Sequence, residues 1–142
     1  MKSVQNALNR RKKGEKGFTL VELLVVVIII GILAAVAVPI YLNQRKSAWR
    51  SSVQSDVKNA SLVLETISTN TNGKLDTKWD VADCAGTAGC TINGEKVTVS
   101  ADNHLDIEIG DDNTYKITGY NDNNKDEKIV YDSSTGSMST TK

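Results

Sequence analysis

The clearest pattern in the chain is an apolar run from Phe18 to Ile40, in which Thr19 and Glu22 are the polar interruptions. A helix of these 23 residues is roughly 35 Å long, which is enough to cross the hydrocarbon core of a bilayer. A buried helix of this length in a soluble protein needs apolar partners on every side, and the rest of the chain is too polar to supply them. We therefore expect residues 18–40 to form a membrane-spanning helix.

A helical rhythm continues through residues 41–70. Apolar residues recur there at steps of three or four: Trp49, Val53, Val57, Ala60, Leu64 and Ile67. Such a stripe buries one face of a helix, while Arg50, Lys58 and Glu65 are expected to face water. Poor helix formers then precede Gly73, which suits a left-handed cap, so the helix is predicted to end near Asn70.

After Gly73 the pattern changes from helical to alternating. Residues 71–96 show little periodicity and are predicted to be a loop, whereas residues 97–132 alternate apolar and polar positions between short polar turns. This pattern predicts an antiparallel sheet of about four strands, and the polar residues 133–142 are expected to form a flexible tail. The fold class is therefore α+β, with a long N-terminal helix packed on a small sheet.

Charge divides the chain at the start of the apolar run. Residues 1–17 contain six basic residues and one acid, which leaves 11 basic and 16 acidic residues from Phe18 onward. Basic residues on one flank of a membrane span mark the cytoplasmic side, so we expect the N-terminus inside and the C-terminus outside. An acidic body does not favour nucleic-acid binding.

The two cysteines, Cys84 and Cys90, lie in the part that would be exported. An oxidising compartment favours a disulfide between them, and we expect one. The alternative is a pair of free or buried thiols. A zinc site would need further ligands, and His104 is the chain's single histidine.

No enzyme motif is visible, and no cofactor is expected. His104 lies at a polar turn and is expected at the surface, and the sequence contains no nucleophile elbow, paired-histidine motif or phosphate loop. A weak calcium candidate is formed by Asp122, Asn124 and Asp126, whose oxygens alternate as in a calcium loop. Glu127 stands where the EF-hand pattern needs glycine, and a polar hairpin loop explains the segment equally well.

Glu22 is the residue that identifies the chain. A carboxylate inside a membrane helix costs on the order of 2.5–3.5 kcal/mol, so it needs a function and a partner. The string Lys16-Gly17-Phe18-Thr19-Leu20-Val21-Glu22 resembles the type IV prepilin signature at each position. The resemblance extends through the leader, the apolar run and the helical continuation, which together make up about half of the chain.

The resemblance implies processing and assembly. A prepilin peptidase would cut after Gly17, remove the leader of residues 1–17 and methylate the new N-terminal Phe18. Glu22 of one subunit would then neutralise the Phe18 amine of another. Implied partners are other copies of the chain, the prepilin peptidase, the assembly platform in the membrane and, before assembly, membrane lipid. The precursor would reside in the cytoplasmic membrane and the product in a surface filament.

Gly31 and Pro39 predict a weak segment in the apolar helix. Proline removes one helical hydrogen bond and clashes with the preceding turn. We expect these residues to act as a hinge, locally unwound in the filament. An ordinary glycine of a membrane helix is the alternative for Gly31.

Three other functions remain open. The first is a pseudopilin of a secretion or DNA-uptake machine. The second is a secreted β-rich domain released by ordinary signal peptidase after Ala35-Val36-Ala37, although the apolar run is long for a signal peptide and contains Glu22. The third is a single-span anchor with an outward binding domain, which leaves Glu22 unexplained.

Overall fold

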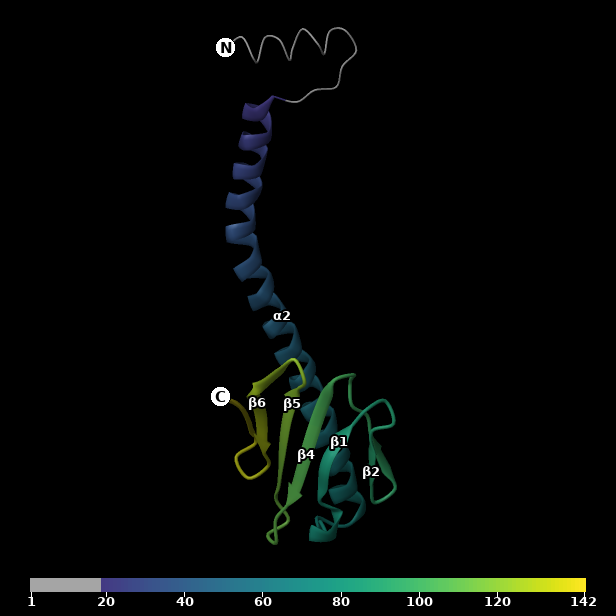
Figure 1. The fold of residues 1–142 in the computed structure, drawn as a ribbon. Coiled ribbons are helices and arrows are strands. Elements are labelled where there is room, and N and C mark those ends of the chain that lie inside the picture. Colours follow the sequence, from purple (N-terminus) through teal and green to yellow (C-terminus); the bar gives the residue numbers. More distant parts are fainter. Residues whose placement is uncertain (1–18) are drawn as a thin grey trace. The chain divides into compact units, whose positions relative to one another are not determined.

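A computed structural model of the chain describes residues 19–142 and divides it into two compact units, Met1–Gln44 and Arg45–Lys142. Helix α2 (Leu20–Asn70) contributes to both units. In the first unit it is the whole of the described structure beyond Thr19. In the second unit, its C-terminal part joins a set of strands to form the head domain (Figure 1).

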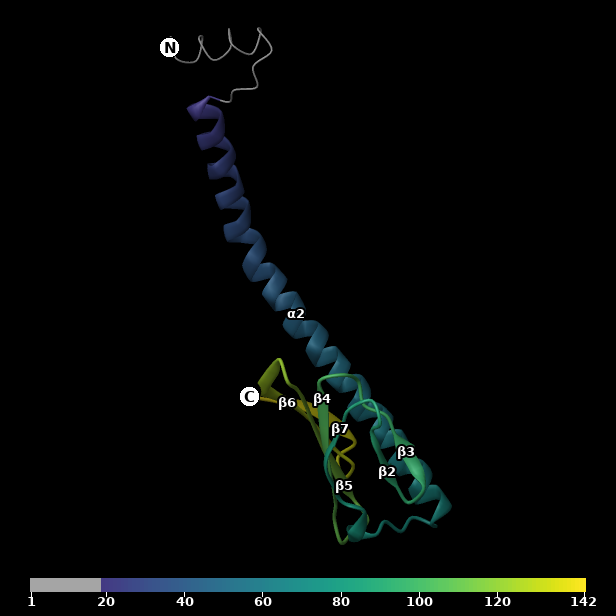
Figure 2. The same ribbon diagram turned by 45° about the vertical axis from the view of Figure 1, so that its right-hand side comes forward.

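The head domain is built on a five-stranded antiparallel sheet in the order β1-β4-β5-β6-β7. Its strands are β1 (Val81–Ala85), β4 (Asn103–Ile109), β5 (Tyr115–Asn121), β6 (Asn124–Asp132) and β7 (Ser137–Thr141). Helix η1 (Thr77–Trp79) precedes β1. Between β1 and β4 the chain forms a separate hairpin, β2 (Cys90–Ile92) and β3 (Glu95–Val97), which Figure 2 shows beside the helix.

The core lies between one face of helix α2 and one face of the sheet. Five of the six predicted stripe residues are buried, and Trp49 is half-buried. They meet the alternate residues Leu105 and Ile107 of β4, Ile117 of β5 and Ile129 of β6, each at most 1% exposed. The predicted α+β architecture, with a long helix packed on an antiparallel sheet, is therefore confirmed.

The number of strands differs from the sequence expectation of about four. Strands β4, β5 and β6 form where apolar and polar residues alternate, but Val97 and Val99 do not lie in one strand of the main sheet. Val97 ends β3 of the separate hairpin, and Val99 is buried in the segment that follows. The main sheet gains β1 from the expected loop and β7 from the expected tail.

Both additional strands lack the alternation that marks a half-buried strand. All five residues of β7 are exposed, and the strand is held by its antiparallel backbone pairing with β6. In β1 the pairing with β4 shifts register between Val81 and Cys84, so the side chains do not alternate regularly between the two faces.

Two polar side chains of helix α2 that were expected to face water are exposed or half-exposed and also contact the sheet. Arg50 donates a hydrogen bond to Glu127 of β6, and this bond lowers the pKa of the Glu127 carboxyl. Glu65 accepts a 2.7 Å hydrogen bond from the Tyr115 hydroxyl of β5. Lys58 is exposed, as expected.

A buried carboxylate also joins the helix to the sheet. Asp56, 5% exposed, accepts hydrogen bonds from the backbone N–H and the hydroxyl of Ser100 and, at 2.7 Å, from the Asn103 amide. Asn103 in turn accepts a 2.6 Å hydrogen bond from the Asn121 amide. We call Asp56, Ser100, Asn103 and Asn121 the Asp56 network. It ties helix α2 to the segment before β4 and to the end of β5.

Candidate functional site

Glu22 lies in the first turn of helix α2 and closes a capping box with Thr19. The Thr19 hydroxyl accepts a 3.0 Å hydrogen bond from the Glu22 backbone N–H, and Glu22 Oε2 accepts a 3.1 Å bond from the Thr19 N–H. Two of the donors left over at a helix N-terminus are thereby satisfied. This role was not predicted from the sequence, although the spacing Thr-x-x-Glu before an apolar run is its ordinary signal.

Helix α2, which carries Glu22 in its first turn, has the length and apolar composition to cross a membrane. Its large apolar side chains from Leu20 to Leu42 are between 47% and 86% exposed. No residue of its most apolar 18-residue window is buried within the described structure. An apolar surface of this extent needs either lipid or the apolar surfaces of other molecules around it.

The remaining sequence-predicted residues of the N-terminal segment divide into two groups. Gly17 and Phe18, the predicted cleavage and methylation positions, lie outside the described residues. Gly31 and Pro39 both lie inside helix α2, which continues through them from Leu20 to Asn70. Their action as a hinge concerns the assembled filament and stays a prediction.

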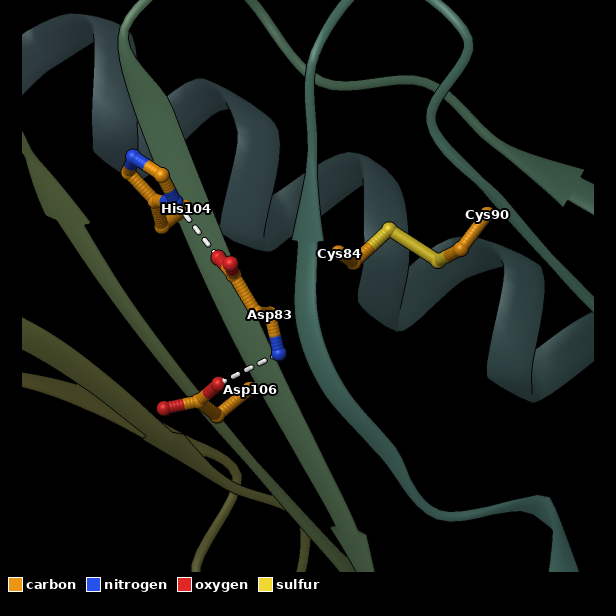
Figure 3. Close-up of a disulfide and its surroundings, with 5 residues drawn as sticks. All are labelled: Asp83, Cys84, Cys90, His104 and Asp106. Atoms are coloured by element: carbon orange, nitrogen blue, oxygen red, sulfur yellow. Dashed lines mark hydrogen bonds and ion pairs between the residues drawn. A yellow bond between two sulfur atoms is a disulfide. The ribbon is translucent and has the colours of Figure 1, made fainter.

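The predicted disulfide between Cys84 and Cys90 is present in the head domain. It joins β1 of the main sheet to β2 of the separate hairpin, with the two Cα atoms 5.4 Å apart (Figure 3). The Cys84 side chain is buried in the core. The bond therefore attaches the hairpin to the sheet next to the irregular part of β1.

The calcium candidate segment forms a tight turn between β5 and β6, with β6 beginning at Asn124. Asp122 contacts His104, and the Asn124 amide donates to Glu127 at 3.1 Å. Among residues 19–142 no group of three or more His, Cys, Asp or Glu side chains is placed to hold a metal ion. Calcium binding by this segment and the hairpin-loop interpretation therefore both stay open.

His104 lies in a polar cluster whose other members were not predicted from the sequence. Its Nδ1 contacts Asp83 of β1, and its Nε2 lies 2.8 Å from Asp122. The ring stacks on Tyr120 of β5, with the centroids 4.9 Å apart. The hydrogen bond to Asp83 raises the pKa of His104, the contact with Asp122 adds to this, and partial burial opposes it.

Known proteins resemble this chain over part of its length. Residues 12–38 match the family described as "Prokaryotic N-terminal methylation motif". The Type IV major fimbrial protein FimA of Dichelobacter nodosus is 47% identical over 55 residues, which is 39% of this chain and 35% of that protein. A Fimbrial protein of Pseudomonas aeruginosa is 69% identical over 29 residues, 20% of this chain and 19% of that protein.

A protein of a secretion system resembles this chain over a stretch of similar length and identity. The Type II secretion system core protein G of Klebsiella michiganensis is 43% identical over 47 residues, 33% of each chain. The matched stretch thus spans about a third or less of the length of these relatives. No solved structure matches significantly. The chain therefore carries an N-terminal methylation motif, and over its N-terminal part it has type IV pilins and pseudopilins as homologues.

Proposed function

We propose that this chain is the precursor of a structural subunit, a major pilin, of a type IV pilus-like surface filament. The observation that carries the proposal is Glu22, a carboxylate in the first turn of a helix whose apolar side chains are exposed. It lies within the segment that matches the methylation motif. An ordinary membrane anchor gains nothing from a carboxylate at this depth.

Processing prepares the subunit for assembly. Prepilin peptidase cuts between Gly17 and Phe18 and methylates Phe18, which leaves a cationic amine next to the apolar helix. Thr19 and Glu22 both remain in the mature chain, so cleavage does not remove the capping box. A carboxylate accepts several hydrogen bonds at once, so the bonds from Thr19 are compatible with a further donor.

Assembly then brings opposite charges together. The Phe18 amine of an incoming subunit meets Glu22 of its neighbour, and each charge offsets the desolvation cost of the other inside the apolar bundle. The exposed apolar side chains of helix α2 exchange lipid for the helices of other subunits. The partners are further copies of the chain, the peptidase and the membrane assembly platform. The precursor resides in the cytoplasmic membrane, and the assembled product is extracellular.

A pseudopilin of a type II secretion machine is a second candidate function. The similarity to Type II secretion system core protein G favours it, because that similarity is comparable to the similarity to the fimbrial proteins. Electron microscopy of filaments sheared from cells separates the two. Long surface filaments that contain this chain support the pilin, and their absence while the processed chain is present favours the pseudopilin.

The processing step is tested by the mass of the mature N-terminus. We expect cell-surface protein to begin at Phe18 with one added methyl group and to lack residues 1–17. Intact-mass and N-terminal peptide analysis measure this directly. A chain that begins at Val38 would instead support cleavage by ordinary signal peptidase, and an uncut leader would support the simple anchor.

The hinge is tested by the structure of the filament. We expect helix α2 to be unwound between Gly31 and Pro39 in the assembled state, because proline removes a backbone bond there and neighbouring subunits can bury the segment. A cryo-electron microscopy map of the filament shows the backbone directly. An unbroken helix through residues 31–39 would exclude the hinge.

A further inference from the structure

Both ring nitrogens of His104 face carboxylate oxygens. Nδ1 contacts Asp83, and Nε2 lies 2.8 Å from Oδ1 of Asp122. An ionised carboxylate only accepts hydrogen bonds, and a neutral imidazole carries a proton on only one nitrogen. Two such contacts are therefore satisfied together only when the ring is the doubly protonated cation.

The two carboxylates belong to different parts of the sheet. Asp83 lies in edge strand β1, where the pairing with β4 changes register, and its backbone is in the left-handed region with φ 56°. Asp122 lies in the turn between β5 and β6. His104 is the second residue of β4, so its ring joins three neighbouring segments.

Strand β1 depends on such contacts because its ladder is irregular. The Asp83 N–H donates a 2.8 Å hydrogen bond to the Asp106 side chain of β4 rather than to a backbone carbonyl (Figure 3). The paired residues on either side of Asp83 are Val81 and Cys84. The Asp106 side chain of β4 therefore accepts a backbone N–H of β1 at the point where the register shifts.

The titratable groups near His104 come from β1, β4, β5, β6 and the turn between β5 and β6. Asp83 of β1, Asp106 of β4 and Asp122 of the turn are acidic. Tyr120 of β5 stacks on the ring, and Lys128 of β6 is the opposing cation, with its Nζ 5.7 Å from the Tyr120 ring centroid. Of these groups, Asp83 and Asp122 act directly on the ring, and both favour a positive charge on the imidazole between them.

We propose that His104 is a proton-dependent clasp that holds edge strand β1 to β4 and to the β5–β6 turn when its ring is charged, and releases one of the two carboxylates when the ring loses a proton. The stabilisation is complete below the pKa of a histidine in the unfolded chain, about 6.5. It is lost as the pH rises through the higher pKa of the folded state. While the carboxylates are ionised, strand β1 and its disulfide are thus held more firmly near pH 6 than near pH 9.

Nuclear magnetic resonance tests the charge of the clasp. His104 is the chain's single histidine, so in the full chain without an affinity tag, held in detergent micelles, the imidazole signals need no assignment. We expect the ring to titrate at a higher pH than a histidine in an unfolded chain. We expect Asp83→Asn and Asp122→Asn each to lower the midpoint of this titration. Asp126→Asn, which removes an exposed acid that does not contact His104 in the structure, is the control and should leave it unchanged. Titration at or below the value of an unfolded chain, or equal midpoints in all four proteins, would overturn the proposal.

Hydrogen exchange tests the effect on β1. We expect the protection of the Asp83 and Cys84 amides, corrected for the intrinsic rate, to fall roughly two- to fivefold from pH 6 to pH 9. A change of this size corresponds to the loss of a partly exposed ion pair. In His104→Gln the corrected protection should be low and independent of pH. Protection that does not change with pH in the unsubstituted chain, or that changes equally in His104→Gln, would contradict the clasp.

Discussion

Replacing Glu22 with glutamine is expected to abolish filaments while the precursor is still inserted, cut and folded. Glutamine also closes a capping box with Thr19, so the helix N-terminus is retained and only the charge is lost. The incoming Phe18 amine then enters an apolar bundle without a counter-charge. Breaking a buried ion pair from one side costs roughly 3–5 kcal/mol, and a filament repeats this loss at every subunit.

Two matched variants separate the charge of Glu22 from its capping role. Glu22→Ala removes the charge and the carboxylate that accepts from the Thr19 N–H, whereas Thr19→Ala removes the hydroxyl that accepts from the backbone N–H of residue 22 and keeps the carboxylate. The lost cap costs about 1 kcal/mol, so Thr19→Ala should still form filaments, in somewhat lower yield. The measurement is filament yield from sheared cells, divided by the amount of processed protein in the membrane fraction.

The pattern across the three variants decides between the two roles. Filaments absent from both Glu22 variants and present in Thr19→Ala support charge pairing between subunits. Normal filaments from Glu22→Gln, together with loss in Glu22→Ala and Thr19→Ala, would assign Glu22 to helix capping alone. Processed protein must be measured in each case, because Thr19 lies next to the predicted methylation position.

The parts of the fold that were predictable are those whose burial is periodic. Val53, Val57 and Leu64 lie on one face of a helix because their spacing matches the helical repeat. Leu105 and Ile107 alternate because one face of β4 packs on the core. Strands β1 and β7 were missed because a register shift in one and complete exposure in the other remove that periodicity.

The candidate site was predictable only where a short local motif carries it. Glu22 stands out because it is a carboxylate in an apolar run, and its cap partner Thr19 is three residues away. His104 gave no such signal, because its partners Asp83 and Asp122 are 21 and 18 residues away and reach it only through the antiparallel register of the sheet. The same holds for the hydrogen bond between Arg50 and Glu127, which are 77 residues apart in the sequence and meet only in the folded chain.

The Asp56 network also consists of polar residues whose role depends on the tertiary structure, and unlike His104 its central carboxylate is buried. Asp56 occupies a position in helix α2 directly before the stripe residue Val57, and it is buried beside it. A buried carboxylate is stable only when its oxygens accept hydrogen bonds, and here Ser100 and Asn103 supply three donors. Within residues 19–142 no buried side-chain nitrogen or oxygen lacks a partner.

Asp56→Ala is therefore expected to be among the most destabilising single substitutions in the head domain. The Asn103 amide, on a side chain that is 1% exposed, keeps its 3.0 Å bond to Ser52 Oγ but loses its 2.7 Å acceptor, which leaves one of its N–H groups unpaired. The Ser100 backbone N–H loses its acceptor as well. An unsatisfied buried donor costs about 1–3 kcal/mol, so the free energy of unfolding should fall by about 3 kcal/mol. For a domain of about 100 residues, this lowers the melting temperature by on the order of 10 °C or more.

A graded series tests whether the network itself is responsible. Asp56→Asn keeps one acceptor oxygen but turns its amide toward a donor, so we expect a loss of about 1–2 kcal/mol. Ser100→Ala removes only the hydroxyl donor of an exposed residue, and its effect should be smallest, about 0.5 kcal/mol. Chemical unfolding of the full chain in micelles, followed by tryptophan fluorescence, measures all three. Equal free energies for Asp56→Ala and the unsubstituted chain, or a larger loss in Ser100→Ala than in Asp56→Ala, would show that Asp56 does not tie the helix to the sheet.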